Sequence, residues 1–123
     1  MRAQPEEALQ CAVAAFCEIA LRPPTTWTAI NPLPGKRSLR QAVRMKRMGL
    51  KPKWPDMLFC HPGFVGWIEL KADKRKPDDG QLQLHANLRA CGHQVAVCWN
   101  IDQVIGTLRG WGIPVMAQAR AAE

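Results

Sequence analysis

Apolar residues recur every three or four positions near the start of the chain, at Leu9, Val13, Phe16, Ile19 and Ala20. This spacing places them on one helix face, so it predicts an amphipathic helix from Pro5 or Glu6 to about Ala20. The helix has to end before Pro23-Pro24, because proline cannot continue a helix and restricts the residue before it.

Three further helices are predicted, from Ser38 to about Met48, from about Asp79 to Cys91, and from Ile101 to Gly110. Ser38 is a suitable N-cap for the first of these, and Gly49 follows its end. Gly92 similarly ends the second. Asn100 or Asp102 lies near the start of the third, where a side-chain oxygen can accept from the free backbone N–H groups.

Four short segments are rich in β-branched, aromatic and other apolar residues and predict strands, at 25–31, 56–60, 64–72 and 93–99. Residues 56–60 and 64–72 are separated by a His-Pro-Gly turn, so we expect them to pair as a hairpin. The last strand is apolar enough to be buried on both faces of a sheet. Mixed helices and strands in this order predict a three-layer α/β sandwich with a central sheet.

The length of 123 residues allows one hydrophobic core and is too short for two, so residues 1–123 are expected to form a single domain. No apolar run approaches the roughly 18 to 20 residues that a membrane span needs. The polar, acidic start of the chain is unlike a signal peptide. We therefore expect a cytoplasmic protein with no membrane partner.

The cysteines, histidines and tryptophans give weaker signals. The five cysteines include no CxxC pair and no HxxxH pair accompanies them, so we expect reduced, buried thiols and neither a disulfide framework nor a zinc site. The histidines are expected to be structural or surface residues. The five tryptophans are expected mainly in the core. Trp54 is the exception, since its position beside Lys53 in a loop makes it a candidate nucleic-acid contact.

Basic residues are concentrated in two places and give the chain a net charge of +7. Residues 36–53 hold eight of the seventeen lysines and arginines and no acid, and residues 74–76 are all basic. Arg40, Arg44 and Arg47 are spaced so that they share one helix face. A basic run can be no more than a solvated surface. Because acids are absent from the first block, the pattern favours attraction of a polyphosphate such as nucleic acid.

Two charged residues, Glu69 and Lys71, interrupt the apolar strand 64–72, and burying them is costly unless they pair or bind something. Both point to the same face, because side chains alternate along a strand. If 56–60 pairs beside this strand, Asp56 comes within reach of Glu69. Two close carboxylates repel unless a cation lies between them, and oxygen ligands alone suit Mg²⁺. A lysine beside such a site can orient a water or neutralise charge on a phosphate.

The order Pro55-Asp56 followed by Glu69-Leu70-Lys71 resembles the PD-(D/E)xK nuclease superfamily. More narrowly, the chain is similar to the VRR-NUC (virus-type replication-repair nuclease) domain from about Glu6 to Trp111. The similar segments are EEALQ in the first helix, MGLKPKWPDM, GWIELKADKRKPDDGQ and LRACGHQVAVCWN. The resemblance implies a restriction-endonuclease-like core and a bacterial or phage-encoded nuclease that depends on Mg²⁺ or Mn²⁺.

The resemblance also assigns roles to individual residues. Asp56 and Glu69 match the two carboxylate metal ligands, and the carbonyl of Leu70 would contribute a third oxygen. Lys71 matches the lysine that positions or activates the attacking water. The family's glutamate in the first helix falls on Glu6, with Glu7 as the competing register.

The family's glutamine after the ExK strand falls on Gln81. With Asp78 as N-cap, Gln81 would occupy the third helical position, where a capping-box glutamine is expected in any case. Asp78 replaces the serine of the family's SPxQ pattern. Lys53 stands where the family usually has glycine, two residues before the proline of PD, so this loop is expected to be bulkier and to contact DNA differently.

We therefore expect a metal-dependent, structure-specific DNA endonuclease that acts as a homodimer and resolves Holliday junctions. Two symmetric cuts need two sites, and the helix 6–20 is a candidate dimer surface. A flap or nick nuclease, a non-catalytic DNA-binding accessory module and an RNA-binding domain are the alternatives. The residues expected to bind branched DNA are Lys36, Arg37, Arg40, Arg44, Arg47, Lys51, Lys53 and Lys74.

Overall fold

A computed structural model describes residues 5–30 and 38–116. Along the chain the elements are α1 (Pro5–Ala20), β1 (Thr26–Ala29), α2 (Leu39–Arg47), β2 (Met57–His61), β3 (Phe64–Leu70), α3 (Asp79–Ala90), β4 (Gln94–Cys98) and α4 (Ile101–Gly110). This is the order predicted from the sequence. Among the described helices, none is long and apolar enough to cross a membrane.

The four strands form one mixed sheet in the order β1-β2-β3-β4. The predicted hairpin is present: β2 and β3 are antiparallel, with Met57 opposite Ile68 and His61 opposite Phe64. Its turn contains Gly63, whose φ of +72° suits a residue without a Cβ. β4 lies parallel to β3, so the chain has to cross over between them, and α3 supplies the crossover.

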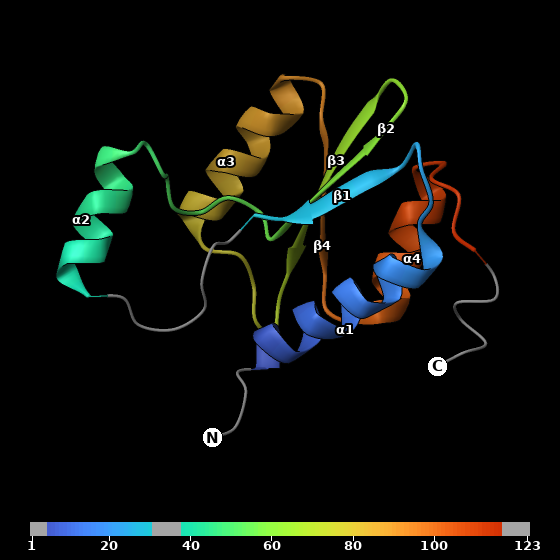
Figure 1. Ribbon diagram of the computed structural model, residues 1–123, viewed down its shortest axis with the longest axis horizontal. Helices are drawn as coiled ribbons and strands as arrows, with labels where there is room; N and C mark the ends of the chain where they lie inside the picture. Colours follow the sequence, from blue (N-terminus) through green and yellow to red (C-terminus); the bar gives the residue numbers. More distant parts are fainter. Residues whose placement is uncertain (1–4, 31–37, 117–123) are drawn as a thin grey trace.

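One face of the sheet is covered by α1 and α4, which pack against each other as well as against the strands (Figure 1). The core on this side combines alternate strand residues with the inner faces of the two helices: Val13, Phe16 and Cys17 of α1, Met57, Phe59, Ile68 and Leu70 of the sheet, and Val104, Ile105 and Leu108 of α4. Alternation along β2 and β3 therefore decides which side chains enter this core.

The opposite face is covered by α3, which completes the three-layer α/β sandwich predicted from the sequence (Figure 1). A smaller cluster on this side is formed by Trp67 of β3, Leu88 of α3 and Val95 of β4, and the half-buried Trp54 packs against it. Glu69 lies two residues after Trp67 in the same strand, so its side chain also faces the α3 side of the sheet.

Some predictions about individual side chains were wrong. Ile19, expected in the core stripe of the first helix, is 51% exposed, and Cys17 is buried in that stripe instead. Cys11 and Cys91 are exposed, contrary to the expectation of buried thiols. β4 is an edge strand: Val95 and Cys98 are buried, one on each face, whereas the residues between them are half-buried.

Helix α2 stands apart from the sandwich (Figure 1). It begins with the predicted cap, in which Ser38 Oγ accepts from the Gln41 N–H and the Gln41 side chain accepts from the Ser38 N–H. None of its residues is buried. A helix this short gains little from intrinsic propensity in water, so its exposed faces are available for contacts outside the described fold.

A glycine in β3 allows an aromatic side chain to lie directly on the sheet. A Cβ added at Gly66 would come within 2.5 Å of the Trp111 ring and 2.8 Å of the Phe64 ring. We predict that Gly66→Ala lowers the free energy of unfolding by about 1–3 kcal/mol, because an overpacked site forces its neighbours to move. Gly106→Ala in α4 is the control, because an added Cβ there would meet no described atom within 4 Å apart from the neighbouring backbone of its own helix. It should be neutral or stabilising by up to about 1 kcal/mol in urea denaturation.

Candidate active site

The hairpin register brings Asp56 and Glu69 together. Because Met57 lies opposite Ile68, the preceding residue, Asp56, falls opposite Glu69. The backbone of Asp56 is also held from the side of β1, where its carbonyl accepts a hydrogen bond of 2.8 Å from the Ile30 N–H. Its carboxylate Oδ2 accepts from the Leu70 N–H at 2.7 Å. Asp56 is therefore fixed through both its backbone and its side chain.

Three charged residues predicted from the sequence converge here and are buried. The exposed fraction is 9% for Asp56, 2% for Glu69 and 8% for Lys71. Lys71 lies just beyond the last residue of β3, and its N–H donates to the Cys98 carbonyl at 3.0 Å. This bond continues the β3–β4 ladder, so the alternation that puts Lys71 on the same side as Glu69 is kept.

Gln81 has both of the roles that the sequence left open. It contacts Glu69 from α3, and it takes part in the capping box at the start of that helix. Its Nε2 donates to Glu69 Oε2 at 3.1 Å, while its Oε1 accepts from the Asp78 N–H at 2.9 Å. Asp78 in turn caps the helix by accepting from the Gln81 N–H. The two interpretations are compatible, because the capping box holds the amide in the orientation that reaches Glu69.

His85 is a site residue that the sequence interpretation missed. It is 1% exposed, and its Nε2 lies 3.4 Å from Glu69 Oε1. Burial lowers the pKa of the imidazole, and the charges of Arg89 and Lys71 lower it further. A neutral ring can still donate one N–H to Glu69. The signal in the sequence was its spacing of four residues from Gln81, which puts both side chains on one face of α3.

Glu6 reaches the site from the first turn of α1. Its Oε2 is buried and accepts no hydrogen bond from the described residues, and the Nη1 atom of Arg75 lies 3.6 Å from it. The charge of Glu6 contributes to raising the pKa of Glu69. Of the two glutamates that the sequence left open, Glu6 is the one whose charge acts on Glu69.

The pKa of Glu69 is raised from its ordinary value of 4.5 to about 8. Burial is the largest cause, followed by the charge of Asp56, and the charge of Lys71 opposes both. At neutral pH the pair therefore carries less than two negative charges unless another cation is present. A bound divalent ion would remove this penalty by letting both carboxylates ionise.

The donor set fits a hard cation better than zinc. Among residues 5–30 and 38–116, no group of three His, Cys, Asp or Glu side chains is arranged to hold a metal ion. Mg²⁺ needs no such cage, since it typically binds one or two carboxylates and keeps several waters or substrate oxygens. Asp56 and Glu69 could supply the carboxylates, with the Leu70 carbonyl as the third protein oxygen that the resemblance implies.

The predicted DNA-binding residues that the structure describes lie at the surface. Arg40, Arg44 and Arg47 on α2 are exposed, as are Lys51, Lys53 and Lys74. The remaining two predicted DNA contacts, Lys36 and Arg37, lie outside the described residues.

Lys53 explains one departure from the family pattern. Its φ of +78° lies in the left-handed region, which glycine adopts without strain and other residues adopt rarely. A glycine at this position is therefore what the backbone would favour. In this chain, Lys53 Nζ instead forms an ion pair with Asp78 Oδ2 at 2.7 Å, which joins the loop before β2 to the start of α3.

No family model matches the chain, and no curated protein matches its sequence. Solved structures do match. One described as a VRR_NUC domain protein is 19% identical, with a TM-score of 0.61, over 89% of each chain. Another, described as a VRR_NUC domain, is 22% identical, with a TM-score of 0.58, over 87% of this chain and 97% of that one. The chain therefore has the fold of VRR_NUC domains, as predicted from the sequence.

The raised pKa of Glu69 makes a prediction about stability. The folded protein without metal retains a proton on Glu69 between about pH 4.5 and 8, whereas the unfolded chain has lost it. The stabilisation from this group is therefore complete below pH 4.5 and is lost as pH rises through 8. Glu69→Gln, which stays neutral, should raise Tm by several degrees at pH 9 in EDTA and by less at pH 5.

Scanning calorimetry measures this difference, with Glu18→Gln on the exposed side of α1 as the control. Mg²⁺ at pH 8 should raise the Tm of the wild type and leave that of Glu69→Gln unchanged. Equal Tm differences at pH 5 and pH 9 would contradict the assignment of a raised pKa to Glu69.

Proposed function

We propose that this protein is a metal-dependent DNA endonuclease that hydrolyses phosphodiester bonds. The observation that carries the proposal is the pair of buried carboxylates, Asp56 and Glu69, held beside the buried Lys71. A core built for stability alone gains nothing from two like charges whose ionisation opposes folding. The fold of VRR_NUC domains and the net charge of +7 support the same conclusion.

In this proposal Asp56, Glu69 and the Leu70 carbonyl hold Mg²⁺ or Mn²⁺. The bound ion supplies Lewis-acid stabilisation of the phosphate and a lowered pKa for a bound water. Lys71 donates a hydrogen bond to the attacking water or to a phosphate oxygen and so orients the reacting groups. Gln81 donates a hydrogen bond to one oxygen of Glu69, and His85 Nε2 lies 3.4 Å from the other. Both contacts limit rotation of the carboxylate that has to bind the ion.

The rival function is a DNA-binding accessory module on the same fold, without catalysis. Such a module requires the basic surface but has no use for a buried carboxylate pair. The close approach of Asp56, Glu69, Lys71 and Gln81 therefore favours the enzyme.

We propose branched DNA as the substrate, bound by a homodimer in the manner of a Holliday-junction resolvase, with monomeric cleavage of flaps or nicks as the alternative. The outward side of α1 supports a dimer surface, because the small residues Cys11, Ala12 and Ala15 are exposed there. An isologous contact of α1 would give two active sites related by a two-fold axis. Light scattering at micromolar concentration distinguishes a dimer from a 13.8 kDa monomer.

Substitutions at the candidate active site should reduce DNA cleavage without reducing DNA affinity. We predict that Asp56→Asn, Glu69→Gln and Lys71→Met each reduce cleavage of labelled junctions, flaps or duplexes by at least about 10²-fold in Mg²⁺. Their affinities for the same DNAs should stay within about threefold of the wild type. Lys76→Met, at an exposed position, is the matched lysine control and should cleave normally. Wild-type protein that binds all of these DNAs and cuts none with Mg²⁺ or Mn²⁺ would favour the accessory module.

The arginine face of α2 should contribute affinity and not chemistry. We predict that Arg44→Gln weakens binding to duplex DNA and lowers the slope of log affinity against log salt by about 0.9 for one lost phosphate contact. Cleavage at saturating protein should be unchanged. Arg109→Gln, at an exposed position on α4, is the control. Equal losses for both variants would mean that the total charge matters and the position on α2 does not.

A further inference from the structure

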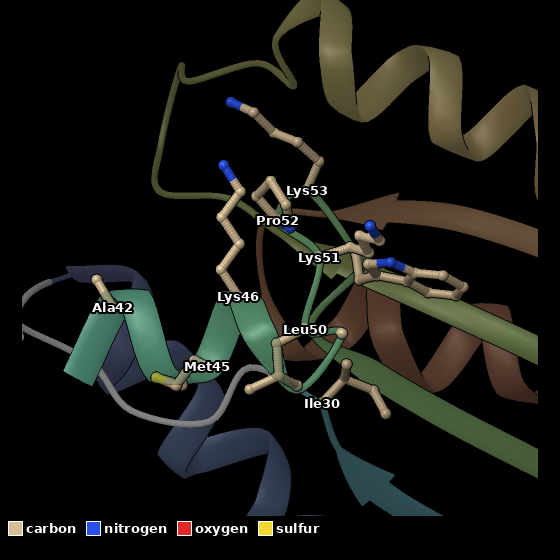
Figure 2. Close-up of a pocket in the computed structure, with 10 residues that line it drawn as sticks. Ile30, Ala42, Met45, Lys46, Leu50, Lys51, Pro52 and Lys53 are labelled. Atoms are coloured by element: carbon tan, nitrogen blue, oxygen red, sulfur yellow. The ribbon is translucent and has the colours of Figure 1, made fainter. Parts of the chain in front are cut away.

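A groove of about 920 Å³ lies between α2 and the loop that leads from it to β2 (Figure 2). Ala42, Met45 and Lys46 line it from the helix, and residues 49–54 line it from the loop. Ile30, at the end of β1, closes it from the sheet. The groove is separate from the Asp56–Glu69 pair and takes no part in the mechanism described above.

The lining combines positive charge with apolar surface. Lys46, Lys51 and Lys53 line the groove, and none of the described residues in its lining carries a carboxylate. In Figure 2 the ammonium groups of Lys46 and Lys53 extend to the same side, away from Leu50 and Met45. Leu50 is 47% exposed and lines the groove together with Met45 and Ile30. The groove thus has a cationic rim above an apolar wall.

Trp54 gives the groove an aromatic side that is held in place. Its ring packs against Trp67 with a centroid distance of 5.2 Å and an interplanar angle of 52°. Trp54 remains half-buried and is one of the residues that line the groove. An aromatic ring immobilised in this way can stack on a nucleobase with little loss of its own conformational freedom.

The groove adjoins the candidate active site through two connections. Trp54 precedes Asp56 by two residues, so their Cα atoms are at most about 7 Å apart. Lys53, on the rim, forms its ion pair with Asp78, the N-cap of the helix that carries Gln81. A ligand in the groove would therefore lie beside a phosphate bound at Asp56 and Glu69.

We propose that the groove binds an unpaired nucleotide of the DNA strand that is cut, adjacent to the scissile phosphate. This rests on the nuclease function proposed above and narrows its substrate to DNA that has a single-stranded nucleotide at that position. The lysines would contact the backbone phosphate, while the base lies against Leu50, Met45 and Trp54. A base inside a duplex has both faces covered by its neighbours, whereas an unpaired base can place one face on an apolar wall.

Charge decides between DNA and a second protein as the occupant. An apolar helix or a second copy of this chain would contact the apolar wall. It would leave Lys46 and Lys51, which form no ion pair with the described residues, without partners of opposite sign, whereas Lys53 already pairs with Asp78. A nucleotide fits both the apolar wall and the cationic rim of the groove, because its base is planar and apolar on its faces and its phosphate is anionic.

The test measures anisotropy of a fluorescein-labelled 12-nucleotide oligo(dT) and of a matched 12-base-pair duplex, with full-length protein in EDTA so that no cleavage occurs. Leu50→Glu places a carboxylate in the groove. Val43→Glu is the matched control, since Val43 is 50% exposed on α2, beside its arginines and outside the groove. We expect Leu50→Glu to weaken oligo(dT) binding at least tenfold and duplex binding less than threefold. Val43→Glu should weaken both by similar factors.

The outcomes separate this inference from the proposed function. If Leu50→Glu and Val43→Glu change the ratio of single-strand to duplex affinity equally, the groove does not bind an unpaired nucleotide, whether or not the wild type cleaves DNA in Mg²⁺. If Leu50→Glu lowers that ratio as expected while the wild type cleaves no DNA in Mg²⁺ or Mn²⁺, the groove assignment stands and the nuclease proposal fails.

Discussion

Two carboxylates buried opposite each other, Asp56 and Glu69, impose the constraint around which this small fold is arranged. Like charges in a low-dielectric environment oppose folding unless they are compensated. The chain compensates them in part: a backbone N–H donates to Asp56, Gln81 donates to Glu69, and Lys71 lies on the same side. The cost of ionising Glu69 is still not fully offset, since its pKa remains at about 8. A bound divalent cation would remove this cost.

The sandwich positions this pair with few elements, and the surrounding surface suits a nucleic acid. The β2–β3 register sets Asp56 opposite Glu69, and the cap of α3 orients Gln81 toward it. The loop before Asp56 carries Trp54 and joins the site to α2, the helix that buries none of its residues. The centre that would do chemistry is therefore rigid and buried, whereas the surfaces that would select DNA lie on a loop and a helix at the periphery.

Much of this arrangement could be predicted because local rules apply to it. Ser38 and Asp78 cap the helices that they were expected to begin, and strand alternation alone places Glu69 and Lys71 on one side. His85 could not be identified as readily, because many polar residues of α3 face solvent and periodicity does not tell which of them faces Glu69. The exposure of Ile19 and Cys11 depends on how α1 is rotated against α4 and the sheet, which is a tertiary property. The groove was also hidden, since it forms between α2 and a loop with no pairing pattern.

The central claim is that a cation replaces a proton at the Asp56–Glu69 pair. The most direct measurement is the number of protons released when Mg²⁺ binds, obtained by titration calorimetry at pH 7 in buffers with different ionisation enthalpies. Because the pKa of Glu69 is about 8, the account predicts the release of close to one proton per Mg²⁺ bound. Binding that releases no proton, or release that persists unchanged in Glu69→Gln, would contradict it.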